Sequence, residues 1–178
     1  MIKIKQDMRA KTVNTIPTFD ELYDTAPQEI KDYIDKCNDT PQGTDWHPEG
    51  NCYVHIRLVY DRARESGDIN LALAAFFHDL GKVDTTAPNK RGGFSAIGHE
   101  RVSARLVEKY KQWIGRMGGQ FMIIKEIVGE HMRIKQMDKM RRPKQEAMKQ
   151  LRTYDQLQQF TKFDDMGTLT DDELNRYK

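Results

Sequence analysis

The segment Leu71–Lys82 constrains the fold and the function of this chain more than any other segment. A run of apolar residues ends directly in His78-Asp79-Leu80-Gly81-Lys82. The apolar residues recur at helical spacing and His78 continues the same face, so we expect it to be buried, with Asp79 beside it at the helix end. Gly81 is expected to let the chain leave this helix. A buried imidazole next to a buried carboxylate is costly unless both are satisfied, and a bound metal ion is a common solution.

Composition places the chain among intracellular proteins without a membrane segment. Its 178 residues are most simply one domain, and 38% hydrophobic with 31% charged residues suit a compact helical protein. The two cysteines, Cys37 and Cys52, lack the spacing of a metal site, so we interpret them as reduced thiols in a cytoplasmic protein. No apolar stretch is long enough to span a membrane, and the N-terminus lacks the core of a signal peptide.

The hydrophobic pattern predicts an all-α fold. We expect an N-terminal arm over residues 1–17 and a single helical domain over residues 18–178. Helices are expected at about 18–26, 27–37, 51–66, 68–79, 95–117, 120–134 and 154–165, with a short one at 170–173. A long loop is expected between residues 83 and 98, and loops of this length are usually functional or mobile.

Six side chains that can bind metal fall on the apolar faces or at the ends of separate predicted helices. They are His55, His78, Asp79, His99, His131 and Asp164. A single histidine on an apolar face is more often a core residue bonded to a carbonyl, but six such groups are hard to explain independently. Imidazole and carboxylate ligands suit Mn, Fe, Co, Ni or Mg and argue against a thiolate zinc site. The fifth histidine, His47, lies in the loop before the helix that carries His55.

The order of these residues resembles the HD-domain superfamily of metal-dependent phosphohydrolases over about residues 46–168. The resemblance is strongest to the HD domain of bacterial CCA-adding tRNA nucleotidyltransferases. Counterparts occur there, in the same order, for His47-Pro-Glu-Gly50, His55, His78-Asp-Leu-Gly-Lys82, Thr85, Gly98-His99-Glu100 and Asp164-x-x-Gly167.

The resemblance implies a ligand set. His55, His78, Asp79 and Asp164 would bind one divalent ion, and Asp79 would bridge to a second ion held by His99 and His131. The paired histidines that relatives carry on the fifth helix are reduced here to His131, which favours one tightly bound ion and a weaker second one. His99 and His131 would otherwise contact the substrate phosphate. Asp165 adjoins Asp164 and is an alternative ligand, although the helical spacing from Leu157 and Phe160 favours Asp164.

The mechanism that follows is hydrolysis of a phosphate ester by water that a metal ion activates. Asp79 and Lys82 are the expected catalytic residues, with Lys82 holding a nonbridging phosphate oxygen. His47 and Glu49 are candidates for substrate binding, for proton donation or for shaping the entrance. Lys90 and Arg91 belong to the long loop and are more simply solvated charges.

The expected substrate is a nucleotide, a cyclic nucleotide or an RNA-end phosphate. The nearest relatives favour 2′,3′-cyclic phosphodiesterase or phosphatase activity. Residues 133–152 carry eight Lys or Arg against two acids and would attract an anion, although most charge runs are solvated helix faces. Hydrolysis of an alarmone or a deoxynucleotide is less favoured, because alarmone hydrolases carry an acidic pair shortly after His-Asp, where this chain has Lys82, Val83 and Asp84. A nucleotide-binding or partner-binding module without catalysis, and a purely structural helical protein, are the remaining alternatives.

Overall fold

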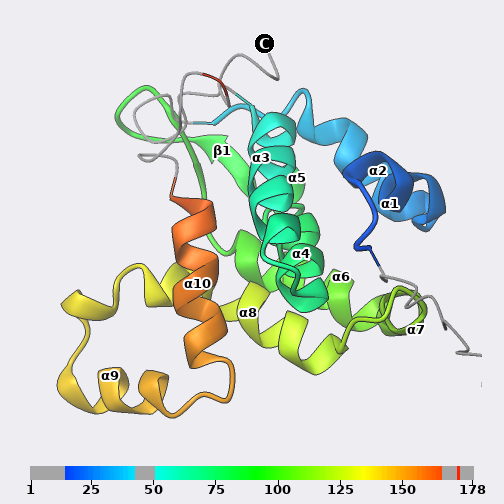
Figure 1. Cartoon of the computed structure of the whole chain (residues 1–178). Coiled ribbons are helices and arrows are strands. Elements are labelled where there is room, and N and C mark those ends of the chain that lie inside the picture. The colour runs from blue at the N-terminus through cyan, green and yellow to red at the C-terminus, as the bar shows by residue number, and fades with distance from the viewer. Residues whose placement is uncertain (1–14, 43–50, 166–171, 173–178) are drawn as a thin grey trace, which may run out of the picture.

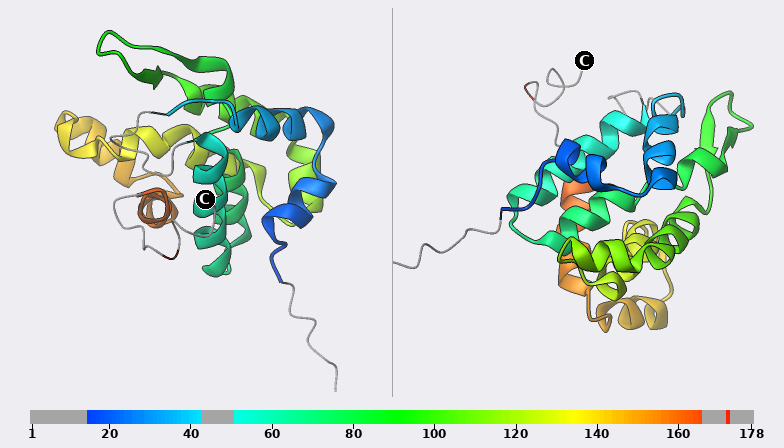
Figure 2. Two further views of the ribbon diagram at one scale, coloured as in Figure 1. Left: turned by 90° about the horizontal axis from the view of Figure 1, so that it is seen from above. Right: turned by 90° about the vertical axis from the view of Figure 1, so that its right-hand side faces the viewer.

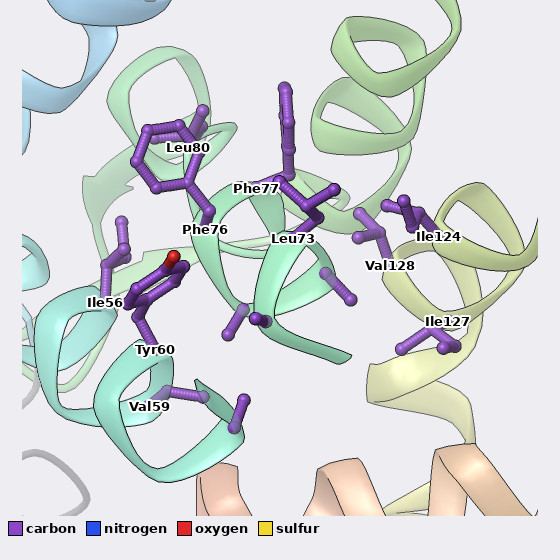
Figure 3. Close-up of a cluster of buried hydrophobic side chains, with 14 of the residues drawn as sticks. Ile56, Val59, Tyr60, Leu73, Phe76, Phe77, Leu80, Ile124, Ile127 and Val128 are labelled. Atoms are coloured by element: carbon purple, nitrogen blue, oxygen red, sulfur yellow. The ribbon is translucent and has the colours of Figure 1, made fainter. Parts of the chain in front are cut away.

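Helix α4 (Ile69–Phe77) lies at the centre of the molecule and is buried along almost its whole length. The side chain of Asp68 caps it by accepting hydrogen bonds from the backbone N–H groups of Asn70 and Leu71. Helices α3 (Cys52–Glu65) and α8 (Phe121–Ile134) pack on either side of α4. Figure 3 shows the apolar side chains of α3, α4 and α8 meeting in this core. An apolar helix needs such cover on several faces, which explains why its sequence is a nearly unbroken apolar run.

The structure is a computed structural model that describes residues 15–42, 51–165 and 172. The remaining helices and the two strands are α1 (Phe19–Thr25), α2 (Gln28–Cys37), α5 (Lys82–Thr85), β1 (Thr86–Pro88), β2 (Phe94–Ala96), α6 (His99–Lys109), α7 (Lys111–Arg116), the 3₁₀ helix η1 (Met137–Lys139), α9 (Arg142–Lys149) and α10 (Tyr154–Asp164). The expected all-α class is confirmed, and Figure 1 shows how the helices surround α4. No helix in the described ranges is long and apolar enough to cross a membrane.

The N-terminal helices form an outer layer over the core. Thr18 and Glu21 make a capping box at the start of α1, as the sequence predicts. The segment before α1 is tied to α3, because Tyr60 donates a hydrogen bond to the carbonyl of Pro17. Cys37 and Cys52 are buried free thiols. Residues 1–14 of the expected arm, and most of the helix expected at 170–173, lie outside the described residues.

The segment expected as a long loop between residues 83 and 98 contains a small antiparallel hairpin, so the expectation of a loop without secondary structure was wrong here. Strand β1 pairs with β2 through Thr86 opposite Ala96 and Pro88 opposite Phe94. The Asn89 side chain closes the turn by accepting hydrogen bonds from the N–H groups of Arg91 and Gly93. The hairpin projects from the helical body in both views of Figure 2.

The helix expected over residues 95–117 is two helices that begin later. Residues 95 and 96 belong to β2, and α6 begins at His99, directly after Gly98 with φ of 83°. The chain leaves helical geometry again at Tyr110, between α6 and α7. Trp113 of α7 is buried and donates a hydrogen bond to the carbonyl of Thr25 at 2.9 Å. This contact links α7 to the end of α1.

Gly81 has a role other than the expected one. Helix α4 already ends at Phe77, and Gly81 has an ordinary φ of −64°. A Cβ at this position would lie 2.3 Å from the carbonyl oxygen of His99 and 2.8 Å from Cβ of Val102. Glycine is therefore required because α6 approaches the backbone closely, not because the chain turns into the left-handed region.

Candidate metal centre

The six candidate ligands come together where several helices begin or end. His55 lies in the first turn of α3, His99 is the first residue of α6, and His131 lies in the last turn of α8. His78 and Asp79 follow α4, and Asp164 is the last residue of α10 (Figure 1). None of the six is more than 4% exposed. Residues separated by more than a hundred positions therefore share one buried site.

Asp79 stands between two pairs of histidines. Its Oδ2 atom lies 3.3 Å from Nε2 of His55 and 3.3 Å from Nε2 of His78. Its Oδ1 atom lies 3.1 Å from Nε2 of His99 and 3.9 Å from Nε2 of His131. Each carboxylate oxygen thus faces a different pair of imidazoles.

Asp164 completes the first of these two groups. Its Oδ1 atom lies 2.9 Å from Nε2 of His55 and 3.6 Å from Nε2 of His78. The neighbouring Asp165 is exposed, and its backbone carbonyl accepts a hydrogen bond from Arg62. Of the two adjacent aspartates, Asp164 is the one whose carboxylate reaches the histidines.

Three of the histidines direct Nε2 towards the site, because their Nδ1 atoms are hydrogen-bonded to the backbone. Nδ1 of His78, of His99 and of His131 lies 2.8, 2.7 and 2.7 Å from a backbone carbonyl three residues earlier. A carbonyl oxygen only accepts hydrogen bonds, so each Nδ1 carries a proton and donates it. Nε2 is left to bind a metal ion, and the hydrogen bond from Nδ1 to the carbonyl fixes the ring orientation.

The donor atoms are spaced closely enough for a bound cation. His55, His78 and Asp79 form one group, and Asp79, His99 and His131 form another, with the ligand atoms of each group within 4.8 Å of one another. Within each pair of histidines the two Nε2 atoms lie only 3.2 Å apart. Such an arrangement of nitrogen and carboxylate oxygen atoms around one point fits a divalent ion of the borderline-to-hard class.

Two lysines balance the buried carboxylates. Lys82 Nζ lies 2.7 Å from Oδ2 of Asp79, and Lys135 forms an ion pair with Oδ2 of Asp164. Burial raises the pKa of Asp79, but the charges of His78 and Lys82 outweigh burial and hold this pKa well below its usual range. Both carboxylates are therefore ionised and ready to bind a cation at neutral pH.

His78 and His131 differ in their affinity for protons. Burial lowers the pKa of His78, but the carboxylates of Asp79 and Asp164 outweigh burial and raise this pKa to about 9. Burial, together with the charge of His78, lowers the pKa of His131 to about 3. In the metal-free protein at neutral pH, His78 is protonated and His131 is neutral.

Comparison with known proteins identifies the family. The model of the HD domain matches residues 52–160, which is more than half of the chain. The chain belongs to the HD domain family. HD domains form a superfamily of metal-dependent phosphohydrolases, and the His/Asp cluster described above lies within or directly beside the matched segment.

Curated relatives of this HD domain are named Multifunctional CCA protein. The relative from Dechloromonas aromatica is 39% identical over 80 residues, which are 43% of this chain and 18% of the relative. Those from Cupriavidus necator and Burkholderia mallei are 42% and 38% identical over 72 and 79 residues. The chain spans less than a fifth of the length of these relatives, since the matches cover 16–18% of them. No solved structure matches the chain significantly.

The other candidate residues from the sequence have different outcomes. His47 and Glu49 fall outside the described residues. Lys90 and Arg91 are exposed in the turn of the hairpin. The basic stretch 133–152 runs over the end of α8, η1 and α9, where most of its charges are exposed.

Two residues at the site were not singled out from the sequence. Lys135 follows His131 by four residues and so shares its helix face, a signal that the sequence does contain. Gln42 is buried and its Oε1 accepts a hydrogen bond from Lys82 Nζ at 2.5 Å. Nothing in the sequence around Gln42 points to this contact, because a segment without helical periodicity places it there.

Proposed function

We propose that this HD domain is a divalent-metal-dependent phosphohydrolase of the cytoplasm that acts on a nucleotide, a cyclic nucleotide or an RNA-end phosphate. The observation that carries the proposal is the position of Asp79, whose two carboxylate oxygens face two separate pairs of histidine Nε2 atoms. A histidine packed only for stability rarely points its free nitrogen at another buried imidazole and a carboxylate.

In this proposal His55, His78, Asp79 and Asp164 hold the first ion. His99 and His131 hold a second ion with Asp79, or contact the substrate phosphate directly. Bound metal would neutralise phosphate charge and lower the pKa of a water molecule towards 7.

The chain contributes orientation and charge to the reaction. The Nδ1–H bonds of the histidines to backbone carbonyls hold the rings in place before any ligand arrives. Lys82 is 8% exposed, so its ammonium group would act on a phosphate oxygen in a partly desolvated environment, where charge interactions are stronger than in water. Asp79 and Lys82 are therefore the proposed catalytic residues.

The substrate class is supported by the relatives and by charge. The resemblance to CCA-adding tRNA nucleotidyltransferases favours a 2′,3′-cyclic phosphodiester or a terminal phosphomonoester. The basic stretch 133–152 would attract such an anion. His47 remains a proposed substrate contact.

A direct test combines metal analysis with a substrate panel. Purified protein would be loaded separately with Mn²⁺, Ni²⁺, Co²⁺ or Mg²⁺ and assayed on 2′,3′-cyclic nucleotides, nucleoside monophosphates and short RNAs with defined ends. We expect hydrolysis with at least one ion, and we expect Asp79→Ala and His78→Ala to abolish it together with most metal binding. Asp155→Asn, a change at an exposed position in the first turn of α10, is the control that should retain both. Full activity of a metal-free Asp79→Ala protein would end the proposal, whereas tight metal binding with no hydrolysis would favour a binding module.

A further inference from the structure

Gln42 has a buried side-chain amide, and among the described residues only its oxygen has a hydrogen-bond partner. The residue is 8% exposed, and the bridge between Pro41 and Asn51 holds its segment beside the start of α3. Its Oε1 atom accepts a hydrogen bond from Lys82 Nζ. Its Nε2 atom is buried and, among the described residues, has no hydrogen-bond partner.

The orientation of this amide is fixed by chemistry. A lysine ammonium group only donates hydrogen bonds, so the amide oxygen, not the nitrogen, must face Lys82. The two N–H bonds of Nε2 are therefore directed away from Lys82 Nζ. Leaving a buried amide donor unsatisfied is costly, so such a group in a folded protein calls for an explanation, which can be a catalytic role or a bound water or ion.

Lys82 has one more N–H group than it has acceptors among the described residues. Its ammonium group carries three N–H bonds. One points to Oδ2 of Asp79 at 2.7 Å and another to Oε1 of Gln42 at 2.5 Å. Within the part of the chain that the structure describes, neither the third N–H of Lys82 nor Nε2 of Gln42 has an acceptor, and the two side chains are in contact, with Lys82 also in contact with Asp79. Donors without acceptors suit a ligand that has only acceptors, and the nonbridging oxygens of a phosphate are such a ligand.

We propose that Gln42 is a substrate-contacting residue whose Nε2 donates a hydrogen bond to a nonbridging phosphate oxygen, while its Oε1 orients Lys82 towards the same phosphate. The inference rests on the proposed function in that it takes the anion to be the phosphate group of the substrate. The competing role is purely structural, in which Gln42 only holds Lys82 in position.

The first experiment measures binding of inorganic phosphate to the protein loaded with Mn²⁺, by calorimetry. Gln42→Met keeps the size of the side chain and removes both its donor and its acceptor. We expect Gln42→Met to weaken phosphate binding about tenfold or more, the usual effect of losing a hydrogen bond to a charged group, with metal content unchanged. Gln145→Met removes another half-buried glutamine, a residue of α9 that donates a hydrogen bond to the carbonyl of Met140, and should leave phosphate binding unchanged. Parent-like affinity in Gln42→Met would overturn the inference.

A double-mutant cycle separates direct contact from the structural role. If Gln42 acts only through Lys82, then Gln42→Met should have no further effect on phosphate affinity in a Lys82→Met background. If Gln42 touches phosphate, a loss of several-fold should remain in that background. Equal affinities of Lys82→Met and of the double variant would reduce Gln42 to a positioning residue and contradict the proposal.

A second measurement does not depend on how the variants fold. In the parent protein loaded with diamagnetic Mg²⁺, the side-chain amide signal of Gln42 should shift in nitrogen–proton NMR spectra as phosphate is added, and the Gln145 signal should not. An unshifted Gln42 signal at saturating phosphate would refute the contact. Phosphate binding that depends on Gln42 in a protein without hydrolytic activity would leave this inference intact and remove the proposed function. Hydrolytic activity together with phosphate binding that does not depend on Gln42 would leave the proposed function intact and refute this inference.

Discussion

Lys135 and Asp164 form an ion pair between the end of α8 and the end of α10. The carboxylate of Asp164 is 3% exposed, while the side chain of Lys135 is 32% exposed. Burial raises the pKa of Asp164, but the charge of Lys135 and the hydrogen bonds of His55 and His78 outweigh burial and hold this pKa well below its usual range. One oxygen of Asp164 is thus held by a lysine while the other faces the histidines.

Lys135→Met should therefore destabilise the metal-free protein at neutral pH by about 1–2 kcal/mol, less than for a fully buried pair because Lys135 is partly hydrated. A lowered carboxylate pKa contributes stability that is fully present above the unfolded pKa of about 4 and is lost as the pH falls through the folded pKa. The difference in the free energy of unfolding between variant and parent should hence be constant above about pH 5 and shrink below about pH 4. Urea unfolding in the presence of a chelator measures this free energy.

The control for this prediction is Lys149→Met. Lys149 pairs with Glu146 on α9, and both side chains are about half exposed. An exposed pair of this kind contributes about 0.5 kcal/mol or less. An equal loss in Lys149→Met and Lys135→Met would show that the burial of Asp164 does not strengthen its ion pair.

Gly81→Ala should damage the site through packing. The new Cβ would lie 2.3 Å from the carbonyl oxygen of His99, so α6 must shift, and His99 with it. We expect a loss of about 1–3 kcal/mol in the free energy of unfolding, as for overpacked cores, together with weaker metal binding at the group that contains His99. Thermal unfolding and metal titration would measure the two effects.

Gly115→Ala is the matched control. Gly115 lies inside α7, and a Cβ there would meet nothing within 4 Å. Alanine is favoured over glycine in a helix, so this change should stabilise the protein by about 0.5–1 kcal/mol. A similar loss in both variants would mean that the close approach at Gly81 has no special cost.

Much of the site could be predicted because its residues obey helical spacing. His55, His78, His99 and His131 each continue an apolar stripe or begin a helix, and burial of that stripe brings them inward. Spacing along one helix does not reveal what faces it across space. The sequence therefore did not predict Gln42 as a residue of the site, because a non-helical segment brings it to Lys82. The sequence also did not predict the break at Tyr110, after which Trp113 of α7 bonds to the carbonyl of Thr25, a contact between residues far apart in the sequence.

His78 makes the stability of the metal-free protein depend on pH. Its pKa is raised from 6.5 to about 9, because the carboxylates of Asp79 and Asp164 outweigh burial. A raised histidine pKa contributes stability that is fully present below the unfolded pKa and is lost as the pH rises through the folded pKa. The free energy of unfolding of chelator-treated protein should thus fall by about 2–3 kcal/mol between about pH 6.5 and pH 9. Urea titrations across this window would test the direction, and a flat or rising profile would contradict it.

The same proton should be released when metal binds, since a ligating imidazole must be neutral. Calorimetry at pH 7 in buffers of different ionisation enthalpy should therefore report about one proton released with the first ion. His131, whose pKa is lowered to about 3, has no proton to release at pH 7, so its binding to a second ion should add nothing to this signal. Absence of proton release with the first ion would show that His78 is not its ligand.

The number of metal ions that each chain binds can be tested directly. Oδ1 of Asp79 faces His99 and His131, so a second ion has a place, but the resemblance to the HD superfamily implies a pair of histidines where this chain has only His131. We expect one tightly bound ion per chain and a second that binds only at high metal concentration or with substrate.

In metal titrations His131→Ala should then lose only the weak second ion and keep the tight one, whereas His55→Ala should lose the tight one. If His131 instead contacts the substrate phosphate, metal stoichiometry stays at one ion per chain in the parent and in His131→Ala alike, and the loss appears mainly in substrate affinity.

Anomalous scattering from crystals soaked at low Mn²⁺ concentration decides between one tightly bound ion and two. A single strong peak beside His55 and His78 is the expected result, because the first group has the larger ligand set. Two equally strong peaks about 3.5–4 Å apart, the separation of other two-metal sites, would overturn the preference for one tight ion.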